Sequence, residues 1–95
     1  MNDRPLHPGQ IQNWQAVALL QGWAEDYQEG RELLVALGIS ALDVKRRYFS
    51  RIADLQNCGV VAVELRKWDG DHFAGRWIPA GKLDASKIAQ EASAA

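Results

Sequence analysis

The residues with the clearest chemical potential are four basic side chains in the stretch 45–51, namely Lys45, Arg46, Arg47 and Arg51. Against Asp43 and Asp54 they give residues 38–63 a net charge of +2, whereas residues 24–37 sum to −3 and the whole chain to −1. Concentrated positive charge can attract the phosphates of a nucleic acid. It can equally be a solvated face without a ligand, so the elements that carry it must decide.

The titratable residues that often form catalytic or metal sites are isolated in this chain. Cys58 is the one cysteine, which excludes an internal disulfide, and no companion ligand lies at the usual spacing of a metal site. We expect it to be a small buried side chain. His7 and His72 lie far apart, and neither accompanies a nucleophile or a carboxylate in a recognisable motif. The sequence therefore predicts no enzyme activity, catalytic residue, metal or cofactor.

The basic stretch is predicted to lie on a helix over residues 41–55. Ser40 and Asp43 have the spacing of a capping box, which marks a helix N-terminus. A rotation of about 100° per residue places Arg46 and Ser50 opposite the core and Lys45 and Arg51 beside it. The predicted core face consists of Ala41, Val44, Tyr48, Ile52 and Leu55.

Two further helices are predicted before this one. Apolar residues recur at helical spacing from Ile11 to Tyr27, which predicts a long helix over residues 9–27. Residues 29–37 predict a shorter helix that buries three leucines and has Gly38 as its left-handed C-terminal residue. Asp26 and Glu29 also fit a capping box, which leaves a second boundary open between the two helices.

A β-hairpin is predicted over residues 60–67 and 73–78, with Asp69-Gly70 as the turn signal. A two-residue turn would pair Val63 with Arg76. A three-residue loop would pair Val63 with Trp77, and we favour this register because it places the apolar side chains on one face. Residues 84–91 are expected to form a short C-terminal helix.

The chain of 95 residues is large enough for one domain. We expect a flexible arm over residues 1–8, a folded domain over 9–81 and a helical tail over 82–95. No apolar run approaches the roughly 20 residues of a membrane helix, and the first residues lack the pattern of a secretory signal. These features predict a cytoplasmic protein without a membrane contact.

The segment Arg31-Glu32-Leu33-Leu34-Val35-Ala36-Leu37-Gly38-Ile39-Ser40 resembles the helix-turn-helix core of winged-helix transcription regulators from bacteria and phages. The segment Asn57-Cys58-Gly59-Val60-Val61 is similar to the step from recognition helix to wing in those proteins. The resemblance covers residues 31–79. It implies an α+β fold, the winged helix-turn-helix, with three helices, a two-stranded wing and here a short C-terminal helix.

The resemblance also implies a set of contacts with double-stranded DNA, because in that superfamily the recognition helix enters the major groove. Arg46 is the best candidate for a guanine contact, since its planar fork fits the guanine edge. Residues implied to face bases are Ser40, Leu42, Asp43, Arg46 and Ser50, and those implied to meet phosphates are Lys45, Arg47, Arg51, Arg66 and Lys67. The function implied is a small regulator from a phage or mobile element, acting as a homodimer through the first or the last helix.

The alternative hypothesis is a protein-interaction module on the same fold, either an adaptor or an inhibitor of a nucleic-acid-binding protein. It rests on the near-neutral charge, the acidic residues Glu25, Asp26 and Glu29, and Trp68 beside the hairpin tip. The acids could dock a basic partner or could simply favour a helix N-terminus. Trp68 could be an exposed contact residue or could fold back over the third helix.

Overall fold

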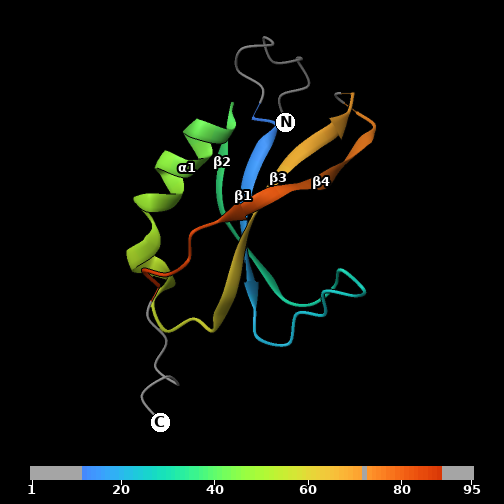
Figure 1. The fold of residues 1–95 in the computed structure, drawn as a ribbon. Coiled ribbons are helices and arrows are strands. Elements are labelled where there is room, and N and C mark those ends of the chain that lie inside the picture. Colours follow the sequence, from blue (N-terminus) through green and yellow to red (C-terminus); the bar gives the residue numbers. More distant parts are fainter. Residues whose placement is uncertain (1–11, 72, 89–95) are drawn as a thin grey trace, which may run out of the picture.

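The computed structural model describes residues 12–71 and 73–88 and shows a four-stranded antiparallel sheet with one α-helix (Figure 1). The strands lie in the order β2-β1-β3-β4, and they are β1 (Trp14–Leu20), β2 (Glu32–Gly38), β3 (Val60–Gly70) and β4 (Gly75–Leu83). The helix α1 (Ala41–Phe49) and the short 3-10 helix η2 (Ile52–Leu55) connect β2 to β3. Both helices pack on one face of the sheet. Because β2 and β4 stand at the two ends of the strand order, they are the edge strands.

The predicted winged helix-turn-helix is wrong, because the described part of the predicted first helix forms a strand followed by turns. Its residues 14–20 form β1, the central strand between β2 and β3. Ala16 to Leu19 are all buried, at 3% exposure or less. A run that is apolar at every position satisfies a helical period and a strand buried on both faces equally well. Gly22, with φ +93°, ends the run in a turn.

The predicted second helix, residues 29–37, is also wrong, and most of it forms β2. Gly30 has φ +149° and leads into the strand, which pairs antiparallel with β1. Gly38 is not the left-handed end of a helix. A Cβ atom there would lie 2.8 Å from a side-chain atom of Val44, so its glycine allows α1 to approach β2.

The helix α1 begins as predicted but is shorter than the predicted range 41–55. Ser40 accepts a hydrogen bond from the Asp43 N–H at its start, which confirms the cap. The helix ends at Phe49, and η2 follows after Arg51. The core-facing set is confirmed, with Val44, Tyr48 and Leu55 buried and Ala41 and Ile52 packed against them.

The hairpin is present, but it is longer than predicted and has neither predicted register. Val63 pairs with Leu83, Trp68 with Trp77, and Gly70 with Gly75. Gly70 is therefore a strand residue, and the loop begins at Asp71, whose carboxylate accepts the N–H groups of Phe73 and Ala74. This carboxylate cap stabilises a turn one step later than the Asp69-Gly70 signal predicts.

The chain after β4 returns to α1 (Figure 1). Residues 84–88 form a turn, not the first part of the predicted C-terminal helix, and Ile88 is buried in the core. The Tyr48 hydroxyl donates to the Asp84 carbonyl at 2.6 Å. The predicted arm over residues 1–8, and residues 89–91 of the tail helix, lie outside the described residues.

Tyr48→Phe is expected to lower the free energy of unfolding by about 1–2 kcal/mol, because the hydrogen bond from the buried Tyr48 side chain to the Asp84 carbonyl is lost. Burial raises the pKa of the Tyr48 phenol, so the hydroxyl keeps its proton at neutral pH. Urea unfolding of the variant would measure the loss. The matched control is Tyr27→Phe, which removes a hydroxyl from a side chain that is 78% exposed. Equal effects of the two substitutions would contradict the assignment.

Candidate functional site

The edge strand β2 carries neither a proline nor a lysine, and the one irregularity in its pairing with β1 is a bulge at Val35. Edge strands expose unpaired backbone groups, and proteins guard them with proline, lysine or inward charges. β4 has such guards, since Pro79 stands within it and Lys82 near its end. β2 has no charged residue after Glu32, and its side chains Leu33 and Leu34 are 42% and 53% exposed. Among the described residues, β2 is paired with β1 alone.

Helix α1 places two arginines beside this edge. The helix packs mainly on β2 and β1, at the β2 side of the sheet (Figure 1). Arg47 and Arg51, one turn apart, line a hollow of about 240 Å³ together with Gln12 and residues 34–37 of β2. A smaller hollow of about 110 Å³ continues toward the start of β2, where Arg51 is joined by Asp54. We call β2 residues 33–37, Gln12, Arg47 and Arg51 the β2 edge site.

The polar groups at the ends of α1 are used by the helix itself. The Asp43 carboxylate accepts the Ile39 N–H and pairs with Arg47 at 3.2 Å. The Ile39 hydrogen bond, and after it the Arg47 guanidinium, lower the pKa of Asp43. Ser50 donates its hydroxyl to the Arg47 carbonyl. Asp43 and Ser50 therefore stabilise the helix ends and do not form a polar surface for a ligand.

The residues predicted to contact DNA do not form one surface. Ser40, Leu42, Asp43, Lys45, Arg46, Arg47 and Ser50 lie on α1 or its caps, with Arg51 just after it. Arg66 faces the opposite side of the sheet, because it alternates with the core residue Leu65. Lys67 stands over the Trp14 ring, 5.4 Å from its centroid. The described residues contain no helix-turn-helix. The DNA-binding hypothesis was based on that motif, so the fold does not support it.

Arg66 is held by two carboxylates on the face away from α1. Its Nη1 and Nη2 atoms donate to the two Glu32 oxygens at 2.9 and 2.8 Å, and its Nε donates to Glu64 at 2.6 Å. The hydrogen bonds that Arg66 donates to Glu32, and after them the one that it donates to Glu64, raise the pKa of Arg66. Glu64 is 6% exposed. The guanidinium thus compensates a buried charge and is committed to that role.

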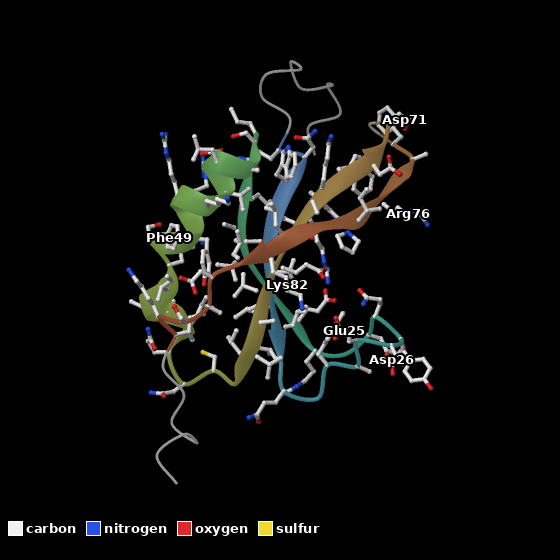
Figure 2. The ribbon with its side chains drawn as sticks, in the orientation of Figure 1. Glu25, Asp26, Phe49, Asp71, Arg76 and Lys82 are labelled. Atoms are coloured by element: carbon white, nitrogen blue, oxygen red, sulfur yellow. The ribbon has the colours of Figure 1, made fainter. Side chains whose placement is uncertain are left out.

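The predicted protein-contact residues lie at different ends of the sheet. The Trp68 backbone N–H donates to the carbonyl of Asn13, which lies just before β1. The Trp68 indole packs on Trp77, with ring centroids 5.3 Å apart. It is neither fully exposed nor folded over α1. Glu25, Asp26 and Glu29 lie in the loop beyond the end of β1, and Figure 2 shows the first two away from α1.

A hollow of about 550 Å³ lies between that loop and β4. Its lining includes Trp77 and Pro79, and its charges are three carboxylates and two cations joined in ion pairs. Glu32 and Glu64 neutralise Arg66, and Glu25 lies 3.8 Å from Lys82, both at the surface (Figure 2). Because both cations are already held in ion pairs with carboxylates, this hollow offers less for recognising a ligand than the β2 edge site does.

Leu33 and Leu34 are surface residues, whereas the predicted helix over residues 29–37 would bury them. The signal was present in Glu32-Leu33-Leu34-Val35-Ala36-Leu37-Gly38, where a short apolar run is bounded by a charge and a glycine. Such a run is typical of a strand. The predicted burial of Cys58 is likewise wrong, since this side chain is exposed.

Within residues 12–71 and 73–88, no group of histidine, cysteine, aspartate and glutamate side chains could hold a metal ion. No helix in the same ranges has the length and apolar character required to cross a bilayer. Comparisons of the chain with models of protein families, with curated proteins and with solved structures gave no match.

The stability that Asp43 contributes is expected to be lost in acid. Its pKa is lowered in the folded state, so its contribution is full above the ordinary value of 3.8 and disappears as the pH falls through the folded pKa. Asp43→Asn should therefore have a smaller loss of stability between pH 6 and pH 2 than the unmodified chain, as measured by urea unfolding. Asp54→Asn, a nearby carboxylate on η2, is the control. An unchanged pH dependence in Asp43→Asn would contradict the prediction.

Arg66→Ala is expected to lower the free energy of unfolding by about 3 kcal/mol, because Glu64 would remain buried without its partner. Lys67→Ala, which removes the neighbouring exposed cation, is the matched control and should cost less than about 1 kcal/mol. Chemical unfolding of both variants would measure the difference. A loss of equal size in the two would show that the Arg66 network is not structural.

Proposed function

We propose that this chain is a protein-interaction module that accepts an extended segment of a partner as a fifth strand beside β2. The observation that carries the proposal is the apolar edge of β2, which has no proline and no charged residue after Glu32 and exposes Leu33 and Leu34 near its start. Strand addition of this kind uses backbone hydrogen bonds for affinity and side-chain contacts for specificity.

The arrangement of the sheet supports binding at β2 in preference to β4. The proline in β4 removes a backbone donor and Lys82 adds a charge, both of which oppose edge pairing. β2 is seven residues long and is anchored along its inner side by six paired positions with β1. A partner strand would therefore meet an ordered template and would not have to order β2 itself.

The apolar side chains of β2 add a second contribution. Leu33 and Leu34 follow each other in the strand, so they point to opposite faces and an added strand could contact one with each of its own faces. Covering both would remove apolar surface from water at roughly 25 cal/mol per Å². Exposed leucines on both sides of one edge thus favour an extended partner over a helix or a small molecule.

We also propose a cytoplasmic location. The chain has one cysteine, and its thiol is exposed. An exposed single thiol is compatible with a reducing compartment.

The double substitution Leu33→Lys and Leu34→Lys is expected to abolish strand addition without unfolding the chain, because both side chains are exposed and lysine guards an edge. The probe is a synthetic peptide that alternates valine and threonine, added to the isotope-labelled chain. Amide hydrogen exchange followed by NMR should slow at residues 32–38 when the peptide binds.

Leu42→Lys is the matched control, since Leu42 is 59% exposed and lies on α1, away from the edge site. Binding of the peptide should persist in this variant. Protection at β4 instead of β2, or binding that survives in the double variant, would overturn the proposed function.

A further inference from the structure

We infer that the segment taken up beside β2 carries acidic side chains on the side that faces α1, where Arg47 and Arg51 select it. This inference rests on the proposed function, because it names the chemistry of the partner at the same site. It is independent of whether the added strand runs parallel or antiparallel to β2.

The hollow between α1 and β2 carries positive charge. Its lining contains two arginines, one glutamine and the apolar residues 34–37, and it contains no carboxylate. Arg47 pairs with Asp43 through Nε, which leaves the hydrogens of its two terminal nitrogens for other acceptors. Arg51 is exposed, and no ion pair is formed by it within the described residues. Arg51 therefore gives the hollow a positive charge that no ion pair among the described residues offsets, and the terminal nitrogens of Arg47 remain open to an anion.

A strand added beside β2 would bring its side chains close to α1. Paired strands lie about 4.8 Å apart, and alternate side chains point to the same face. Every second side chain of the partner would project toward α1, beside the two guanidinium groups. A carboxylate there can accept two parallel hydrogen bonds from an arginine, a geometry that a neutral side chain cannot match.

The preference for acidic side chains is expected to vary along β2. Near the start of the strand, Asp54 joins Arg51 in the smaller hollow and offsets its charge. Arg47 and Arg51 act together only in the larger hollow, beside residues 34–37. The acidic positions of the partner are therefore expected opposite the centre and the end of β2, and its start should tolerate neutral residues.

The same charges disfavour a second copy of this chain as the occupant. Two copies joined antiparallel through β2 would form a continuous sheet with both helices on one face. Arg47 and Arg51 of each copy would then meet those of the other across the junction. Like charges in that arrangement repel one another, whereas an acidic partner strand neutralises them.

The experiment compares three synthetic peptides that alternate valine with glutamate, glutamine or lysine, and measures their binding to the full chain by fluorescence anisotropy. The glutamate peptide should bind about fivefold or more tightly than the glutamine peptide, as two partly exposed ion pairs allow. The difference should shrink as salt is added. The lysine peptide should bind least.

The variant Arg47→Glu with Arg51→Glu should reverse the order and prefer the lysine peptide. Arg51→Glu alone, which leaves the Asp43 pair intact, should reduce the preference for glutamate in part. Lys45→Glu with Arg46→Glu changes the net charge by the same amount on a part of α1 outside the hollow. It should keep the order of the unmodified chain.

The outcomes separate this inference from the proposed function. Equal binding of the glutamate and glutamine peptides, with protection at β2, would overturn the acidic preference and leave strand addition intact. The inference would also be overturned if Lys45→Glu with Arg46→Glu lost the preference for glutamate as fully as Arg47→Glu with Arg51→Glu. That result would show an effect of net charge. No binding of any peptide would overturn both. A dimer in sedimentation that is lost in Leu33→Lys with Leu34→Lys would identify a second copy as the occupant and overturn the acidic partner.

Discussion

The burial of β1 on both faces is the constraint on which the rest of the structure depends. Ala16 and Ala18 are fully buried toward α1, and Val17 and Leu19 are 3% exposed on the other side. A strand of this kind needs neighbours along both edges and cover on both faces. β2 and β3 supply the edges, α1 covers one face, and the Arg66 network with the loop after β1 covers part of the other. The small alanines also allow the large Tyr48 ring to pack close to the sheet.

The two faces use their charges in different ways. On the face away from α1, Arg66 is fixed between Glu32 and Glu64, and its role is to compensate a buried carboxylate. Beside β2, Arg47 and Arg51 project from a short helix next to backbone and apolar side chains. A similar number of charged groups therefore supports the fold in one place and supplies a selective surface in the other. Burial and pairing, not sequence position, distinguish the two.

The parts of the fold that short-range chemistry determines could be predicted from the sequence. The Ser40 cap depends on residues three apart, and the core face of α1 depends on its own rotation. The existence of the hairpin also followed from β-branched residues around a glycine turn. The sheet could not be predicted in this way, because β1 and β2 are apolar at nearly every position and fit either period. The hairpin register failed for a different reason, since the Asp71 carboxylate caps the turn and allows Gly70 to remain in the strand.

The candidate site was predicted only in part for the same reason. The arginines of α1 were identified as a charged surface, but their partner surface is β2, which the helical interpretation buried. Arg66 and Lys67 were grouped with them on the basis of a wing that the structure does not contain. Charge alone could find the residues, and only the pairing of β2 with β1 shows which of them stand beside an open edge.

The path of the chain from β2 through α1 to β3 has a consequence for how the protein folds. β1 pairs with β2 through one loop, but its pairing with β3 joins Leu20 to Val60 and Trp14 to Lys67. Closing that longer loop costs entropy before the contacts of the core can form, so formation of the β1–β3 ladder is expected to limit the folding rate. Until then β1 is itself an edge. A hairpin of β1 and β2 without β3 would have two open apolar edges, the arrangement that most favours pairing with another chain.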